Sequence, residues 1–178
     1  MRRVNLFGGT RGMAALCVAA TLVFAGAALI YIFDRPPGSA YLLPAGWGAH
    51  GTGRSWFSDV GDWLPSFAHA FAFTVFTAAV LPAARATPWV AAALWIVIGS
   101  VLEVGQHPAL AATWAAALPA WFADVPVLDH LAAYWRNGGF DSADLAAGVI
   151  GCVSAATCVL VVRSREFRRE GANHVHVI

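Results

Sequence analysis

Charged residues are scarce in this sequence, and lysine is missing from it altogether. Charged side chains make up 12% of the 178 residues, and the eleven cationic ones are all arginine, for a net charge of +1. A nucleic-acid surface needs a broad excess of basic groups, so this composition argues against a nucleic-acid partner. The 59% hydrophobic content and the mean hydropathy of +0.64 indicate a membrane protein, with the lipid bilayer as its surroundings.

Cysteine is rare as well, and its spacing excludes the usual cysteine chemistry. Cys17, Cys152 and Cys158 all lie inside apolar stretches, and no two of them form a CxxC pair. This argues against both a redox motif and a zinc site, so we expect them to be small packing residues. Only His69 lies well within an apolar stretch, which leaves a buried haem without a second histidine ligand. We therefore predict no cofactor.

Long apolar runs divide the chain into four predicted membrane-spanning helices. A helix needs roughly 20 apolar residues to cross about 30 Å of hydrocarbon. Four segments reach that length, namely 13–33, 66–84, 89–106 and 143–162. No low-complexity linker or repeat separates them, so the sequence predicts one all-α integral membrane bundle over residues 1–178. Its other segments are two outer loops and a tail, at 34–65, 107–142 and 163–178.

Arginine is distributed unevenly around these spans, and its distribution predicts their orientation. Short cytoplasmic segments of membrane proteins carry an excess of positive charge. Eight arginines flank one side of the predicted spans, namely Arg2, Arg3, Arg11, Arg85, Arg163, Arg165, Arg168 and Arg169. Only Arg35, Arg54 and Arg136 fall in the two long loops. We therefore expect a multi-pass protein of the cell membrane with both termini in the cytoplasm and both long loops outside.

Two apolar segments allow another interpretation. Residues 13–33 follow a basic start and contain small residues at 25–27, as a cleavable signal peptide does, but the run is long enough to be a retained anchor. Residues 109–123 are apolar, yet a helix of ~15 residues rises only about 22 Å and Pro119 interrupts it. We expect short helices in the outer interface there, because the second outer loop carries Trp114, Trp121, Tyr134 and Trp135. The first outer loop, rich in Gly and Pro, is expected to be an irregular cap.

The fourth span carries a row of small residues at four-residue spacing. The row consists of Ala143, Ala147, Gly151 and Ala155. Small residues let helix backbones approach closely in membranes, so we expect this ridge to pack inward. Asp144 lies on the adjacent stripe and would then be carried toward the bundle.

Polar residues interrupt three of the spans near the same predicted face of the membrane. His69, Glu103 and Asp144 lie within about 6 Å of one plane at ~1.5 Å of rise per residue. Gln106 shares a helix face with Glu103, and Asp141 shares one with Asp144. Ionisable groups are costly in hydrocarbon, so their recurrence at one depth predicts a shared site.

Three sequence motifs in this region resemble the VanZ-like membrane protein family. They are the Ser-Phe-Ala-His-Ala-Phe-Ala-Phe run at 66–73, the Glu-x-x-Gln at 103–106, and the Asp-x-x-Asp-Leu at 141–145 followed by Gly151. That family has a His followed by aromatics in one helix, an E-x-x-Q near the end of the next, and a D-x-x-D-L opening the last. The family is named for a protein of resistance to the glycopeptide teicoplanin. The resemblance implies an envelope-associated membrane protein rather than a particular reaction.

Each candidate residue also has a purely structural interpretation. Glu103 is either a proton-exchanging group or a hydrogen-bonded carboxyl that fastens the third span to its neighbours. His69 is either a base or ion-pair partner for Glu103 or a packed core residue. Asp144 is either part of the site or a first-turn acid favoured by the helix dipole, with Ser142 as the cap. The candidate binding residues are Gln106, an interfacial hydrogen-bonding group, and Asp141, a solvated loop end.

A metal site is the weaker hypothesis. Together His69, Glu103 and Asp144 supply three N/O ligands, the number of a catalytic site with one open position. They come from separate segments without a compact motif, so we predict no metal.

Three functions are compatible with the pattern, and the sequence does not decide whether the protein is an enzyme. The first is a VanZ-like protein that handles or senses an amphiphilic envelope component, and its enzymatic version would use Glu103 or His69 for acid–base transfer on a lipid-linked group. The second is a proton-coupled transporter, disfavoured because no ionisable residue lies in the inner half of a span. The third is a non-catalytic scaffold whose polar groups set helix register.

Overall fold

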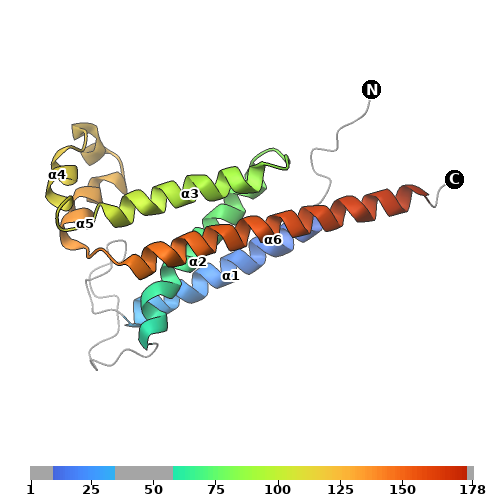
Figure 1. Ribbon diagram of the computed structural model, residues 1–178, viewed down its shortest axis with the longest axis horizontal. Helices are drawn as coiled ribbons and strands as arrows, with labels where there is room; N and C mark the ends of the chain where they lie inside the picture. Colours follow the sequence, from blue (N-terminus) through green and yellow to red (C-terminus); the bar gives the residue numbers. More distant parts are fainter. Residues whose placement is uncertain (1–9, 35–57, 176–178) are drawn as a thin grey trace.

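A computed structural model describes residues 10–34 and 58–175, and every regular element in these two ranges is helical (Figure 1). The longer elements are α1 (Thr10–Asp34), α2 (Ser58–Val80), α3 (Thr87–Val104) and α6 (Ser142–Val175). Between α3 and α6 the chain forms α4 (Ala111–Ala116), α5 (Leu131–Asn137) and the 3₁₀ turns η1 (Ala120–Asp124) and η2 (Leu128–His130). The all-α prediction is thus confirmed for the described chain. The irregular cap expected in the first outer loop falls mostly on residues 35–57, outside the described residues.

Four helices are long and apolar enough to cross a membrane. Their apolar portions are Arg11–Phe33, Gly61–Val80, Thr87–Val104 and Ser142–Arg168. Two helices extend well beyond the predicted spans, by about two turns or more. The second begins at Ser58 rather than Ser66 and continues through Pro65, although proline removes one backbone donor and its ring crowds the carbonyl group one turn earlier. The fourth runs to Val175 instead of ending at residue 162, because the arginines and glutamates that follow are good helix formers.

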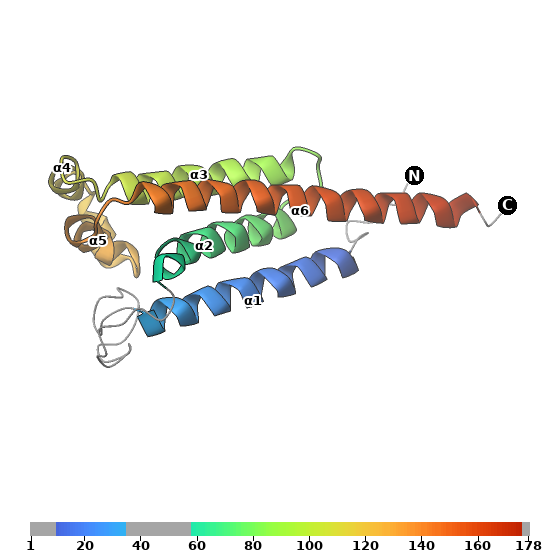
Figure 2. The same cartoon turned by 60° about the horizontal axis from the view of Figure 1, so that its bottom comes forward.

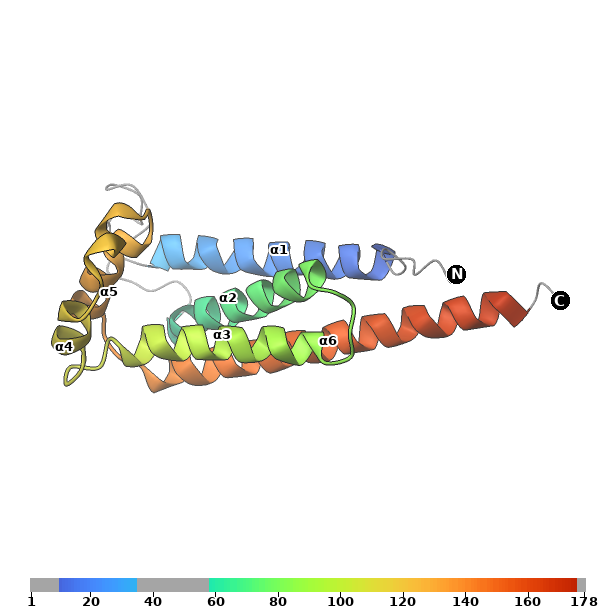
Figure 3. The same ribbon diagram turned by 90° about the horizontal axis from the view of Figure 1, so that it is seen from above.

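The four long helices lie side by side. Two of them form the centre, and each of these two carries one of the remaining helices. The central pair is α2 and α6, with α1 packed against α2 and α3 packed against α6 (Figures 2 and 3). The start of α1, the turn between α2 and α3, and the last part of α6 lie at one end of the molecule (Figure 3). The short helices α4 and α5 lie at the other end (Figures 1 and 3). This second end is called the α4–α5 end below.

Small side chains let α2 and α6 approach closely. The buried core contains Ala20, Ala72, Val75, Ala78, Ala91, Ala155 and Val159, with Cys152 and Ala156 in a second cluster. At Gly151, an added Cβ atom would lie 2.5 Å from the carbonyl oxygen of Phe67 on α2. Ala147, Gly151 and Ala155 are buried, as the ridge predicted, whereas Ala143 is exposed. The inward packing of the ridge is therefore confirmed for three of its four members.

Two side chains of α6 fasten the end opposite α4 and α5. Arg163 donates from Nη2 to the Ala78 carbonyl oxygen at 2.7 Å and from Nη1 to the Ala84 carbonyl oxygen at 3.4 Å. Glu166 Oε1 accepts the backbone N–H of Gly12, in the first turn of α1, at 2.9 Å. A carboxylate is favourable at a helix N-terminus and a guanidinium at a C-terminus, so α6 holds the start of α1 and the end of α2.

Candidate functional site

A buried acid lies in the last turn of α3, and a buried amide lies in the turn that follows this helix. Glu103 is 8% exposed and Gln106 is 7% exposed. Glu103 Oε1 accepts the backbone N–H of Asp141 at 2.6 Å, and Oε2 accepts Gln106 Nε2 at 3.2 Å. Gln106 Nε2 also lies 2.9 Å from the Tyr134 hydroxyl, to which it donates. These contacts join the end of α3 to α5 and to the start of α6.

A second polar contact joins α2 to α6 at the same end of the molecule. The Ser66 hydroxyl donates to Asp144 Oδ1 at 2.7 Å, and both residues are half-buried. The charges of Asp141 and Asp144 both act on Glu103. We call these six residues the polar cluster: Ser66, Glu103, Gln106, Tyr134, Asp141 and Asp144. It gathers three carboxyl groups at the α4–α5 end.

Tyr134 supplies a hydroxyl that stays neutral next to these acids. Burial raises its pKa to about 12, and the negative charges of Glu103 and Asp144, together with nearby Tyr31, act in the same direction. The hydrogen bond from Gln106 opposes the shift. At neutral pH, Tyr134 is therefore an O–H group that both donates and accepts hydrogen bonds.

Asp141 caps α6, which corrects the capping expected from the sequence. Its Oδ1 atom accepts the backbone N–H of Ala143 at 2.8 Å, in the first turn of the helix. Ser142 was expected in that role, but it is the first residue of α6 rather than the residue before it. Asp144 does occupy the first turn, where the helix dipole favours an acid. Asp141 is thus exposed at the end of the loop, as expected. It also forms hydrogen bonds through both its backbone N–H and its side chain.

Two glycines allow α5 to sit directly on the end of α3. An added Cβ at Gly105 would overlap the indole of Trp135, and one at Gly138 would overlap the amide oxygen of Gln106. Trp135 is only 5% exposed and meets Trp114 of α4 edge to face, with ring centroids 5.7 Å apart. The aromatic residues of this segment were expected at the membrane interface, yet Trp135 is buried in contact with α3. Tyr134 enters the polar cluster through this packing.

His69 does not join the polar cluster. Its Nδ1 atom lies 2.8 Å from the carbonyl oxygen of Pro65, within α2. Its ring packs edge to face on Phe24 of α1, with centroids 4.6 Å apart, and lies 5.8 Å from Phe73. The side chain faces α1. Of the three side chains expected to converge, Glu103 and Asp144 do so and His69 does not.

The arrangement of acids and histidine offers little support for a metal centre. Among the described residues, no group of three or more His, Cys, Asp or Glu side chains is placed to hold a metal ion. The three-ligand set weighed from the sequence required His69, which faces α1 instead. The cysteines are free thiols, with Cys152 buried in the helix packing.

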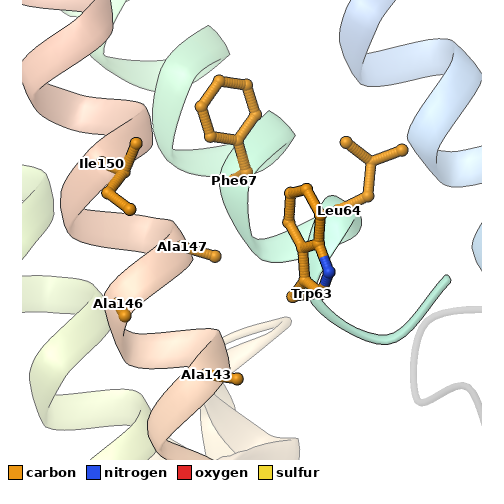
Figure 4. Close-up of a pocket in the computed structure, with 7 residues that line it drawn as sticks. All are labelled: Trp63, Leu64, Phe67, Ala143, Ala146, Ala147 and Ile150. Atoms are coloured by element: carbon orange, nitrogen blue, oxygen red, sulfur yellow. The ribbon is translucent and has the colours of Figure 1, made fainter. Parts of the chain in front are cut away.

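An apolar groove lies between the first turns of α2 and α6. It has a volume of about 560 Å³ and is lined by Trp63, Leu64, Phe67, Ala143, Ala146, Ala147 and Ile150. Figure 4 shows Trp63 and Phe67 of α2 across from the small side chains of α6. Two of the lining residues are sequence neighbours of the hydrogen-bonded pair. Phe67 follows Ser66, and Ala143 precedes Asp144. The same two helices therefore carry a carbon-lined groove and an acid–hydroxyl pair at the α4–α5 end of the molecule.

Ser66 and Tyr134 belong to the polar cluster, although the sequence did not predict them as members of the site. Ser66 opens the aromatic run at 66–73, but a serine near a helix end gave no reason to choose it over its neighbours. Tyr134 lies 28 residues from Gln106 along the chain, in a segment whose aromatic content pointed to the membrane interface. No protein-family model, curated protein or solved structure matches the chain, so its own geometry is the basis for assigning a function.

Proposed function

We propose that this is a VanZ-like membrane protein of the cell envelope that handles or senses an amphiphilic envelope component through the polar cluster. One observation carries the proposal: α2 and α6 carry both the Ser66–Asp144 hydrogen bond and the apolar groove near their first turns, at the α4–α5 end. An amphiphile has a polar head joined to an apolar chain, and this end of the molecule offers a surface of each kind. Binding sites of this type combine mostly apolar walls with a few well-placed polar groups.

The proposed topology puts the polar cluster on the outer side. In this proposal all four long helices cross the membrane, and the α4–α5 end faces the extracytoplasmic space. Arg85 and Arg163 belong to the opposite end, where Arg163 reaches the carbonyl oxygens of Ala78 and Ala84. An arginine-rich end is typical of the cytoplasmic side. Reporter fusions at the end of α6 and within α4 test this: cytoplasmic and external signals, respectively, are expected, and the reverse pattern contradicts it.

Asp144 and Ser66 are the residues that we assign to contact with the polar head. A carboxylate attracts a head that carries an ammonium group or donates hydrogen bonds from hydroxyls. Gln106 and Tyr134 hold the neighbouring helices, and Asp141 fixes the first turn of α6 from which Asp144 projects. We assign no catalytic role to His69, because its ring packs on α1 rather than next to Glu103.

Glu103 fits a positioning role better than acid–base chemistry. Both of its carboxyl oxygens accept hydrogen bonds from the protein, one from a backbone amide and one from Gln106. A general acid or base must reach the proton it transfers within hydrogen-bonding distance. A buried carboxyl whose oxygens both hold other segments of the chain serves first to fix those segments.

The functional test uses the family resemblance to choose an amphiphile. We expect a susceptible host that produces the protein to show an altered minimum inhibitory concentration of teicoplanin. Asp144→Asn and Ser66→Ala should bring that concentration back toward the value for the empty host at equal membrane abundance. The matched control is Asp124→Asn, since Asp124 is an exposed acid at the same end outside the cluster. If none of the cluster variants differs from the control, the amphiphile-handling function is wrong.

The hydrogen bonds of Glu103 also favour a second candidate, a non-catalytic scaffold. In that case Glu103→Gln lowers the stability of the protein in detergent and changes the inhibitory concentration only as far as it lowers membrane abundance. Glutamine keeps an acceptor for the Asp141 N–H but brings an N–H₂ group toward the Gln106 amide, where two donors then face each other. A change in inhibitory concentration at unchanged abundance would rule the scaffold out.

A further inference from the structure

We propose that α6 binds an anionic phospholipid, with the lipid phosphate at Arg165 and Arg168 and an acyl chain along the helix face that leads to them. The inference goes beyond the proposed function, because it concerns the end of the molecule opposite α4 and α5. It needs α6 to cross the membrane but does not depend on which end faces the cytoplasm. Three observations carry it: an exposed pair of arginines, an exposed apolar face that leads to them, and an excess of positive charge around them.

The last part of α6 carries two exposed arginines on one side of the helix. Arg165 and Arg168 are three residues apart, which puts them at neighbouring positions of one helix face. Arg168 Nε donates to the Ser164 carbonyl oxygen at 3.4 Å, which uses one of the five N–H donors of its guanidinium. This part of α6 extends past the turn between α2 and α3 (Figures 1 and 3). Both guanidinium groups therefore lie where a lipid head group can reach them.

Positive charge dominates this end of the molecule. The acid nearest to the pair along the chain, Glu166, accepts the backbone N–H of Gly12 at 2.9 Å and is thus turned toward α1. Among the described side chains, Glu166 is the acid of this end, whereas five arginines belong to it, namely Arg11, Arg85, Arg163, Arg165 and Arg168. An anionic partner is therefore attracted to this end and a cationic one is repelled.

An exposed apolar face of α6 leads to the arginine pair. Val153 is 42% exposed and Val161 is 43% exposed, and Thr157 lies between them at four-residue spacing. The Thr157 hydroxyl donates to the Val153 carbonyl oxygen at 2.9 Å, so its hydrogen bond is made within the helix. Arg165 follows Val161 by four residues and shares its face. One strip of α6 therefore passes from apolar to cationic side chains.

The length of this strip matches one leaflet of a bilayer. From Val153 to Arg165 the helix rises ~18 Å. The hydrocarbon of a whole bilayer is about 30 Å thick, so one leaflet contributes about 15 Å. A phospholipid whose acyl chain lies on Val161 and Thr157 therefore has its phosphate at the level of the two arginines.

Charge and geometry together select the head group. A guanidinium can donate two parallel hydrogen bonds to a phosphate, which an ammonium group cannot. Phosphatidylcholine also has a phosphate, but its own ammonium group is repelled by the arginines, whereas phosphatidylglycerol carries no positive group. Each arginine close to a membrane surface strengthens attraction to anionic lipid by about fivefold. The proposal therefore predicts a preference for phosphatidylglycerol over phosphatidylcholine.

The test uses two photoreactive lipids, a phosphatidylglycerol and a phosphatidylcholine, that carry a diazirine at the same acyl carbon. The full-length protein in phosphatidylcholine vesicles is labelled with a small fraction of each lipid, and labelled residues are mapped by mass spectrometry. Labelling at Thr157 and Val161 by phosphatidylglycerol is expected to saturate and to exceed labelling by phosphatidylcholine several-fold. Labelling at Val101, a 43% exposed residue near the other end of α3, should show no preference for phosphatidylglycerol.

Two double variants separate a site on α6 from diffuse attraction to the whole end. Replacing Arg165 and Arg168 by glutamine should weaken the apparent affinity for phosphatidylglycerol by about 25-fold. Replacing Arg11 and Arg85 by glutamine removes the same charge from exposed positions on other elements and should have a much smaller effect. Glutamine is also a good helix former, so both variants should keep the native circular dichroism. Equal losses from the two variants would overturn the proposal, and so would equal labelling by both lipids at every exposed position.

A soluble competitor distinguishes a lipid from free phosphate. Unlabelled phosphatidylglycerol should displace the probe, and glycerol phosphate at the same concentration should not, because it has no acyl chain to lie on the helix face. Equal displacement by the two would mean that the arginines bind phosphate as such, and the lipid proposal would be wrong.

Failure of this proposal differs from failure of the proposed topology and function. If neither lipid labels Thr157 or Val161, α6 does not cross the membrane, and the topology and the lipid site are both wrong. If both lipids label them equally, the lipid site alone is wrong. Asp144 precedes Arg165 by about 30 Å of helix rise, so Asp144→Asn should leave the labelling unchanged whether or not it alters the inhibitory concentration.

Discussion

The close approach of α2 and α6 at Gly151 predicts a sharp difference between two glycine-to-alanine substitutions on one helix. At Gly151 an added Cβ would lie 2.5 Å from the Phe67 carbonyl oxygen and 3.2 Å from the backbone nitrogen of Phe71. Both are backbone atoms, so relief requires moving a helix rather than turning a side chain. At Gly148, one turn earlier on α6, an added Cβ would meet nothing within 4 Å. The two positions thus share a helix and differ in steric environment.

The magnitude follows from two opposing effects. Replacing glycine by alanine within a helix stabilises it by about 0.8–1.0 kcal/mol, and this gain applies to both positions. Overpacking a well-packed contact costs about 1–3 kcal/mol, and this cost applies only at Gly151. We expect Gly148→Ala to be neutral or stabilising. The difference between the two variants isolates the steric cost, so Gly151→Ala should have a free energy of unfolding lower than that of Gly148→Ala by about 1–3 kcal/mol.

The assay is reversible unfolding in mixed detergent micelles, followed by helical circular dichroism as the fraction of denaturing detergent rises. Equal free energies of unfolding for the two variants would refute the close packing of α2 against α6 and, with it, the placement of Ser66 next to Asp144.

Three further predictions address the two ends of the molecule. Arg163→Ala should destabilise the protein by about 1 kcal/mol relative to Arg165→Ala in the same assay. This is less than the roughly 1.5–3 kcal/mol of a buried charged hydrogen bond, because the guanidinium is only half-buried. Equal stabilities of the two variants would contradict the role of Arg163 at the end of α2. Gly138→Ala should lower thermal stability and Gly139→Ala should not, because only the first would push a Cβ atom into the buried Gln106 amide. Identical melting temperatures for the two variants would count against that packing. The pKa of Tyr134 rises from 10.0 to about 12 on folding, so between these values the unfolded chain releases a proton that the folded chain keeps, and stability falls as pH rises through this window. The Tyr134→Phe variant should lose less free energy of unfolding than the native protein over the same pH range, and parallel pH profiles would be inconsistent with a buried tyrosine.

Hydrophobic runs predicted the long helices because helix length and apolar content are properties of contiguous sequence. The same is true of depth along a helix, and this is why Glu103 and Asp144 do meet at one end of the molecule. The position around the helix axis is a different matter. His69 follows Ser66 by three residues, which at about 100° per residue turns it roughly 60° around the axis of α2. That rotation carries the ring onto Phe24 of α1 and away from Glu103.

Caps and contacts between distant segments were harder to predict for a different reason. Asp141 and Ser142 are both good capping residues, and a shift of one residue in the start of α6 decides between them. The contact of Tyr134 with Gln106 depends on how α5 folds back onto α3, which the two glycines permit but do not specify. The aromatic residues of that loop therefore predicted a membrane interface, whereas packing against Gly105 buried one of them.

The bonds around Asp141 explain how a buried acid on α3 influences a site formed by α2 and α6. Glu103 accepts the backbone N–H of Asp141, and the side chain of the same aspartate caps α6 through Ala143. The backbone and the side chain of Asp141 thus both hold the first turn of α6. Asp144 lies in that turn and accepts the hydrogen bond from Ser66. Removing the Glu103 carboxyl would free the N–H of Asp141 and loosen the turn from which Asp144 projects. For that reason Glu103 variants should change the affinity for an amphiphile through the position of Asp144, and stiffening of the same turn by another substitution should restore it.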